Sequence, residues 1–364
     1  MKIAIVGMGA SGASLASFLS AKEELEISIF EPALSRKNHL WGFWDDGSPA
    51  FEAARHCRQH SWDSLAFVHG EQRRQVDVPQ SPYSVVNSRD FIQSCEKNLR
   101  DSTKIIRESV ISLSENPREA IVKTREREEG FDLVFDSRPP MFPTNTLQQH
   151  FLGRWVEMPS PVFDPETATL MDFRPRPEEP FHFIYVLPIS RTRALIESTC
   201  YSPATREENW YRRRIHDYLQ EWGEGYEILE EESGQIPLHS GSSSQGERIK
   251  SIGLRSGTLR ASSGYAFAQN LIQSQKIAEQ VFDSVDLCIP DSCLPMEKWM
   301  DEVMLRLIRQ RPQQAIEAMM AVPGALDGLD FTEFMTGHSK ARTRWSLIWG
   351  LPKAPMISAA LGWQ

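Results

Sequence analysis

The sequence predicts a mixed α/β fold: a parallel-sheet domain, an antiparallel-sheet domain inserted into it, and a helical C-terminal segment. Three observations support this. An apolar strand at residues 3–6 leads through a glycine turn into a helix pattern. Regularly spaced strand patterns fill residues 151–199, and amphipathic helix patterns follow at 298–308 and 313–320. At 364 residues the chain is also long for one compact domain.

The N-terminal part reads as a βαβ unit. Residues 13–21 form a helix pattern with Leu15, Phe18 and Leu19 on one face, and a second strand pattern covers 25–30. Because a helix joins these two strands, we expect them to be parallel. Later patterns predict strands at 74–78, 83–86, 120–124 and 133–135 and a helix at 88–99. The aromatic and polar stretch 38–49 is too irregular for a helix.

The middle of the chain reads as a sheet. Strand patterns cover 151–157, 167–173, 181–187 and 194–199, and a charged helix pattern covers 209–222. A returning strand at 249–254 and a helix from 264 to 281 follow. We therefore expect a dinucleotide-binding domain built from 1–140 and 246–290, with 50–85 reaching toward the substrate domain. The substrate domain spans 141–245, and a helical region spans 291–364.

Composition narrows the class of protein. The formal net charge of -9 argues against a nucleic-acid binder. The chain has no apolar run of about 18 residues that could span a membrane. The N-terminus has no small-residue cleavage site after an apolar stretch, which predicts a cytoplasmic protein. The five cysteines lack zinc-ligand spacing, so we expect reduced thiols and no metal site.

A glycine motif lies between the first strand and the first helix. Gly7, Gly9 and Gly12 form G-x-G-x-x-G, in which the glycines permit the turn, the approach of a pyrophosphate and close helix packing. The helix N-terminus then offers free N–H groups to phosphates. Glu31 ends the second strand, where an acid accepts hydrogen bonds from ribose hydroxyls. The motif predicts a Rossmann-type dinucleotide site; the alternative is a glycine turn without a ligand.

A second glycine-rich segment follows the returning strand. Gly253, Gly257 and Gly264 are spaced as in two-part flavoproteins, whose chain returns for a second turn near the flavin. This pattern favours FAD, which the first motif alone does not distinguish from NAD. The alternative is an ordinary loop.

Several longer motifs resemble those of the bacterial lycopene cyclase family. The most specific is the aromatic stretch 38–46, similar to the family's N-H-x-W-x-F-x-D-D. The strand 132–138 resembles a family strand that ends in Asp-x-Arg. The other matching segments are 149–151, 171–172, 183–188, 195–201, 232–237 and 253–267.

The resemblance implies an isomerase that cyclises the ψ-ends of lycopene into ionone rings, with β the expected ring type. It implies FAD in its reduced form, kept reduced by NADPH or NADH, although the net reaction is not redox. Because lycopene dissolves in membranes, a peripheral membrane contact is expected. The apolar segment 345–351, with its two tryptophans, is the candidate; the alternative is a helix packed on the protein body.

The chemistry requires a carboxylic acid in apolar surroundings, where desolvation keeps it protonated. Glu197 is the candidate by its match to the family's acid, and the alternative is a surface carboxylate paired with an arginine. Asp172, on a neighbouring strand, is expected to orient that acid or accept the final proton, or else to be structural.

Further residues are candidate contacts of the cofactor or the substrate. The resemblance implies that Asp136 binds the cofactor. Arg89 is expected to contact FAD or to be an exposed helix residue. Trp41, Phe43 and Trp44 are expected to line a polyene channel, face the flavin or pack in the core.

Two other functions remain open from the sequence. A flavin monooxygenase or halogenase would share the first domain but usually carries Gly-Asp in the returning turn, where Gly253 is followed by Leu254. A non-catalytic nucleotide-binding protein is a further class. Ser198 stands where relatives usually carry a second acid, which leaves open a cyclase for another terpenoid.

Overall fold

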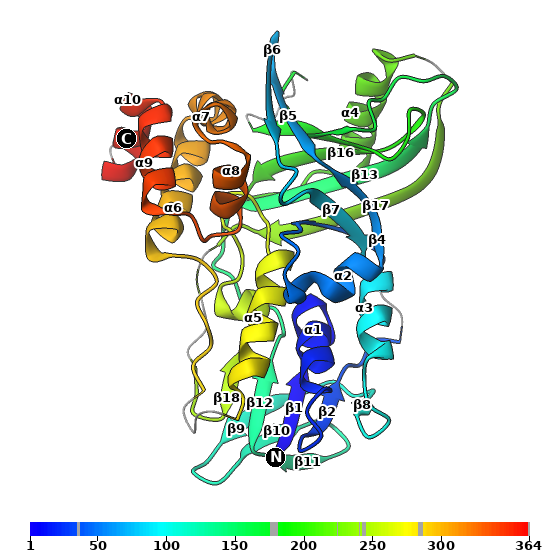
Figure 1. The fold of residues 1–364 in the computed structure, drawn as a ribbon, viewed down its shortest axis with the longest axis vertical. Coiled ribbons are helices and arrows are strands. Elements are labelled where there is room, and N and C mark those ends of the chain that lie inside the picture. The colour runs from blue at the N-terminus through cyan, green and yellow to red at the C-terminus, as the bar shows by residue number, and fades with distance from the viewer. Residues whose placement is uncertain are drawn as a thin grey trace.

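The structure is a computed structural model that describes residues 1–34, 37–174, 181–223, 225–239, 241, 245–282 and 287–362. The molecule is elongated (Figure 1). A parallel sheet with the N-terminus lies at one end, and a large, mostly antiparallel sheet lies at the other. The C-terminal helices pack beside the large sheet.

The parallel sheet has the order β18-β12-β1-β2-β8, and all four of its strand pairs are parallel. Its strands are β1 (Lys2–Val6), β2 (Glu26–Phe30), β8 (Lys104–Ile106), β12 (Leu133–Asp136) and β18 (Ile249–Ser251). The helices beside it are α1 (Ala10–Leu19), α3 (Ser88–Lys97) and α5 (Phe267–Gln280). A small sheet covers the other face, with strands β9 (Ser112–Glu115), β10 (Ala120–Lys123) and β11 (Glu128–Phe131).

Alternation along β1 explains this layering. Ile3 and Ile5 pack with α1 and α5, whereas Ala4 and Val6 pack with β10 and β11. Successive residues of a strand point to opposite faces, and a strand covered on both faces is therefore apolar throughout.

The large sheet has seven strands in the order β17-β13-β16-β15-β14-β5-β6. The strands are β5 (Ser64–His69), β6 (Gln72–Asp77), β13 (Gln148–Glu157), β14 (Thr167–Asp172), β15 (His182–Pro188), β16 (Arg193–Ser202) and β17 (Glu227–Pro237). All pairs are antiparallel except β14 with β5. Helix α4 (Glu208–Gln220) packs on one face through an apolar cluster.

The opposite face of the large sheet packs against the C-terminal helices. These are α6 (Pro295–Gln310), α7 (Pro312–Ala325), α8 (Gly328–Met335), α9 (Ala341–Gly350) and α10 (Lys353–Leu361). A second small sheet, ordered β3-β7-β4, lies between the parallel sheet and the seven-stranded sheet (Figure 1). Its strands are β3 (Leu40–Trp44), β4 (Arg58–Trp62) and β7 (Tyr83–Asn87), and the short helices η1 (Pro49–Phe51) and α2 (Glu52–His56) lie between β3 and β4.

The predicted fold class is confirmed, and several element assignments are corrected. The helix expected from residue 264 begins at Phe267, because Gly264 has φ +76° and belongs to the preceding turn. The sequence did not predict seven strands of the described chain: β3, β4, β5, β8, β9, β11 and β17. In β17, five of the first seven residues are polar or charged, which hides the strand pattern. Among the described residues, no helix combines the length and apolar character needed to cross a membrane.

Candidate functional site

The main cavity, of about 740 Å³, lies where the parallel sheet meets the large sheet. Its wall on the parallel-sheet side comes from the turn after β1, the end of β2 and the start of α5. Its wall on the other side comes from β13, β15 and β16. Six of the candidate residues named from the sequence line this cavity: Gly7, Gly9, Glu31, Trp41, Glu197 and Gly264.

The glycine turn has the geometry that a phosphate group requires. Gly7 has φ +91°, and a Cβ on Gly12 would lie 2.0 Å from the carbonyl oxygen of Gly7. A Cβ on Gly9 would meet no atom within 4 Å, because Gly9 faces the cavity. No side chain caps α1 and no acidic residue occupies its first turn, so the positive helix end opens toward the cavity. The turn therefore fits the pyrophosphate of a dinucleotide.

Glu31 lies beside this turn with only 8% of its surface exposed. Its carboxylate accepts hydrogen bonds from the backbone N–H groups of Met8 (2.8 Å) and Ala33 (2.9 Å). An ionised carboxylate has about four acceptor positions, so a carboxylate at this place can accept more than two hydrogen bonds. Glu31 thus supports the glycine turn and borders the cavity at once.

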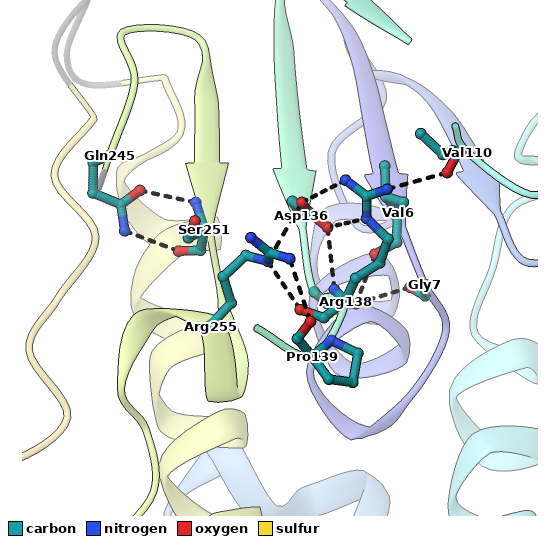
Figure 2. A network of polar contacts seen from close by, with 10 residues as sticks. Val6, Gly7, Val110, Asp136, Arg138, Pro139, Gln245, Ser251 and Arg255 are labelled. Carbon is teal, nitrogen blue, oxygen red and sulfur yellow. Dashed lines mark hydrogen bonds and ion pairs between the residues drawn. The ribbon is translucent and has the colours of Figure 1, made fainter. Parts of the chain in front are cut away.

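Asp136 ends strand β12 beside the glycine turn, where it binds two arginine side chains and does not line the cavity (Figure 2). Its carboxylate accepts two hydrogen bonds of 2.8 Å from the guanidinium of Arg138, and Arg255 lies 3.4 Å away. Arg255 also donates to the carbonyl of Arg138 (2.9 Å). Asp136 therefore does not border the cavity itself, but it holds Arg138, which does.

The returning turn packs directly on the first helix. Gly253 has φ +65°, and a Cβ there would lie 2.9 Å from Cβ of Ser11. Gly257 has φ +81° and ends a short helical turn (η2, Gly253–Ser256). Neither glycine lines the cavity; the segment reaches it through Leu254 and Gly264. The start of α5 also borders the cavity, through Phe267 and the residue before it.

Glu197 projects from β16 into the apolar end of the cavity, next to Tyr185 on β15. Thr199 donates a hydrogen bond of 2.7 Å to its Oε1. Burial raises the pKa of Glu197 to about 8, with a further contribution from the negative charge of Glu232. No cation of the described residues forms an ion pair with it. Glu197 is therefore a carboxyl group that holds a proton at neutral pH.

Glu232 is the site residue that the sequence analysis missed. In the sheet register, Gly153 lies directly between Glu197 and Glu232, and a Cβ on Gly153 would touch Glu197 Cβ and Glu232 Cγ, both at 3.5 Å. Burial raises the pKa of Glu232 to about 7. Its Oε2 accepts from the backbone N–H of Leu40 (3.0 Å). Glu232 lies in the segment 232–237, which resembles a family motif, but only the strand register shows that this acid lies near Glu197.

Asp172 does not lie with Glu197. It aligns with Ile184 and Ser198, whose side chains point to the α4 face of the sheet, opposite to Glu197. There it is ion-paired with Arg174 (2.5 Å) and accepts from the Tyr218 hydroxyl (2.8 Å). The expectation that Asp172 assists Glu197 is therefore corrected, because the sheet separates the two groups.

Ser198 shares the face of Asp172, and its hydroxyl bonds His182 at 2.8 Å. The departure from the family pattern at this position therefore leaves the cavity wall around Glu197 unchanged. Arg89 is exposed and does not line the cavity, as in the second alternative for this residue.

The three aromatic residues of β3 divide between cavity and core. Trp41 lines the cavity, and its ring lies 5.1 Å from that of Phe267. Phe43 and Trp44 are buried in the core, and Trp44 packs at 4.8 Å on Tyr265, which itself lines the cavity. No group of His, Cys, Asp or Glu in the described part of the chain is arranged to hold a metal ion.

Solved structures that share this fold include flavoproteins. A flavoprotein/dehydrogenase from Cytophaga hutchinsonii matches with a TM-score of 0.65 at 13% identity, over 100% of both chains. A geranylgeranyl bacteriochlorophyll reductase-like protein from Thermoplasma acidophilum matches with a TM-score of 0.63 at 11% identity, over 99% of this chain and 98% of the other. HpxO from Klebsiella pneumoniae, complexed with FAD, gives 0.59 at 12% identity, over 97% of this chain and 99% of the other. These likenesses show the fold.

Sequence comparison is more specific. The chain is 23% identical to a lycopene beta-cyclase from Pantoea ananas, over 98% of this chain and 96% of the relative. A lycopene beta-cyclase from Pseudescherichia vulneris is 25% identical over 66% of this chain and 64% of its own length. The family model described as lycopene cyclase protein matches residues 2–361. The cavity thus belongs to an enzyme of the cyclase type, and the chain is a member of the lycopene cyclase family.

Proposed function

We propose that this enzyme closes the acyclic ψ-ends of lycopene into ionone rings of the β type, with Glu197 as the proton donor. One observation carries this proposal. A carboxyl group with a pKa near 8 faces a largely apolar cavity whose other wall is a dinucleotide-type glycine turn. An ionised acid could not protonate an alkene, whereas a desolvated neutral one can.

The reaction consists of two proton transfers and one ring closure. Glu197 gives its proton to the terminal double bond and leaves a tertiary carbocation. The next double bond attacks this cation, which forms the ring bond and moves the positive charge to the ring. Loss of a ring proton then restores a double bond. The sum is an isomerisation, since one proton enters the substrate and one leaves.

Glu197 and Glu232 together can handle both protons. Once Glu197 has donated, its carboxylate lies beside the cation and stabilises it electrostatically. The same carboxylate can take up the released proton, and Glu232 two strands away can exchange protons with it. Trp41 and Tyr185 line the cavity with aromatic faces that attract a cation.

The site fits FAD. Gly7, Gly9 and the start of α1 would hold the pyrophosphate, and Glu31 the ribose, while Trp41 and Tyr265 line the part of the same cavity left for the flavin. Reduced flavin would supply negative charge near the carbocation. Because the net reaction is not redox, NADPH or NADH would serve to keep the flavin reduced.

We also propose a peripheral membrane contact through α9 and α10, because the substrate is dissolved in the bilayer. Trp345 and Trp349 are 62% and 72% exposed, and Ile357 is 53% exposed. Tryptophan rings favour the membrane–water interface. The flanking Lys340 and Arg342 lie near Glu333 and Asp330, so anionic lipid would compete with these local ion pairs.

Expression in a bacterium that accumulates lycopene tests this function. Pigment extracts should contain cyclised carotenoid with the wild-type enzyme, and unchanged lycopene with Glu197→Gln. Purified protein of both kinds should carry flavin, since Glu197 does not belong to the glycine turn. Wild-type protein that binds flavin, leaves lycopene unchanged and consumes oxygen with NADPH would instead indicate a flavin monooxygenase.

A further inference from the structure

A second, smaller cavity lies between the large sheet and the C-terminal helices. Its volume is about 70 Å³, and its floor is formed by Phe67, Leu170, Met171 and Tyr185 of strands β5, β14 and β15. Its roof is formed by side chains from α6 to α10. We call it the methionine cavity because six of the twelve methionines of the chain line it: Met171, Met300, Met304, Met319, Met335 and Met356.

The methionine cavity adjoins the main cavity. Three residues line both: Tyr185, Ser263 and Tyr265. Tyr185 lies directly beside Glu197 in the sheet register, and β14 and β5 follow on the same side. Since neighbouring strands are about 4.8 Å apart, the sheet floor runs for roughly 14 Å from Glu197 to Phe67. The two cavities therefore form one line across the sheet, divided by the two tyrosines.

The residues that line the methionine cavity suit an apolar ligand chain that can bind in more than one position. Methionine side chains are unbranched and polarizable, and they adapt their packing to different ligands. The polar groups at one corner already have partners: Arg260 is paired with Asp301 at 2.9 Å, and Ser262 donates to Asp301 at 2.8 Å. A bound hydrocarbon would thus leave no buried charge unpaired.

Helices α9 and α10 of the roof carry apolar side chains both toward the methionine cavity and toward the outside of the molecule. Leu347, Leu351 and Met356 of the α9–α10 region line the methionine cavity, whereas Trp349 and Ile357 of the same region are exposed. A helix pair that only covered a core would carry polar residues on its outer side. This arrangement places the methionine cavity directly behind the surface proposed to contact the bilayer.

We propose that the methionine cavity is a second substrate subsite, which opens to hold the polyene chain beyond the end that reacts at Glu197. The proposal rests on the proposed function and adds where the unreacted part of the substrate binds. At about 70 Å³ the cavity is too small for that chain as it stands, so binding requires the methionines and the two tyrosines to move. The subsite selects long, linear, apolar chains over short ones.

Binding of lycopene from detergent micelles tests this subsite separately from catalysis. Glu197→Gln serves as the background, because it should hold lycopene without converting it. Adding Met304→Trp, which fills the cavity, should weaken lycopene binding at least tenfold. Adding Met296→Trp is the matched control, because Met296 lies on the same helix but is 49% exposed; it should leave binding unchanged. Equal binding by both double variants would overturn the subsite.

A second measurement uses the unaltered chain, in case Met304→Trp prevents folding. An apolar polyene with a photoreactive group at one end should label peptides of α6 and α7 when its other end occupies the main cavity. Labelling confined to peptides outside the helical roof would overturn the proposal. Conversion of lycopene by Glu197→Gln would instead overturn the proposed function, while the labelling pattern still decides on the subsite.

Discussion

Glu197, which is partly buried, and Asp172, which is buried, are carboxylates of the same sheet, but they lie on opposite faces and have opposite surroundings. Asp172 contacts Arg174 and Tyr218. Glu197 accepts a hydrogen bond from the Thr199 hydroxyl, and the negative charge of another acid, Glu232, acts on it. Burial next to a cation stabilises the ionised acid, whereas burial next to an anion stabilises the protonated one. The partner, and not burial alone, separates a structural acid from a proton donor.

Replacing Glu197, the acid on the cavity face of the sheet, should have the largest effect on activity. Glu197→Gln keeps the size of the side chain but removes the acid, so cyclisation should fall by about 10²–10⁴-fold. Product formation per bound flavin is the measurement. The comparison of the two faces would be wrong if Glu197→Gln were active and Asp172→Asn were not.

Removing the acid on the other face should affect stability instead. Asp172→Asn leaves Arg174 without its carboxylate and weakens the bond from Tyr218, so the free energy of unfolding should fall by about 1–3 kcal/mol. Denaturant unfolding measures this loss. Activity per folded molecule should stay near that of the wild type, because the sheet separates Asp172 from the cavity.

The pH dependence should follow the proton on Glu197. Because its pKa is raised to about 8, activity should decline as the pH rises through 8, by about tenfold at pH 9. The folded protein binds a proton that the unfolded chain releases above pH ~4.5, so this group makes the fold less stable as pH rises from ~4.5 to 8. Unfolding measured across this range should show a weaker pH dependence in Glu197→Gln.

Glu232→Gln should give the smallest change, and it refines the same comparison. Without the negative charge of Glu232, the pKa of Glu197 should decrease, and the decline in activity should begin at lower pH. The pH profile of kcat/KM measures this shift. An unchanged profile would mean that burial alone sets the pKa of Glu197 and that the two acids do not interact.

The contrast between the faces also explains what the sequence could predict. The βαβ unit with its glycines follows from local periodicity and turn chemistry, and all of it was found. The sequence could not show which face of the large sheet Asp172 occupies, because every residue of β14 is buried and a register shift lies between Thr169 and Asp172. Alternation of buried and exposed residues, the usual guide to strand faces, is absent there.

Glu232 was missed for a related reason. It reaches Glu197 only through the pairing of β17 with β13 and of β13 with β16, contacts between residues far apart in the chain. Its strand begins with a run of five exposed residues, three of them glutamates, so no local pattern marks it as part of a buried site. Glu197 itself was found through the family motif, but only the structure shows that none of the residues it describes pairs a cation with this acid.

A measurement of the protonation state of Glu197 is the most direct test of its proposed role as proton donor. Infrared difference spectra between the wild type and Glu197→Gln, recorded at neutral pH, should contain the carbonyl band of a protonated carboxylic acid, which is lost above pH 8. The same subtraction with Asp172→Asn should lack such a band. A carboxylate signal from Glu197 at neutral pH would contradict the proposed role of Glu197 as proton donor, because an ionised group could not begin the cyclisation.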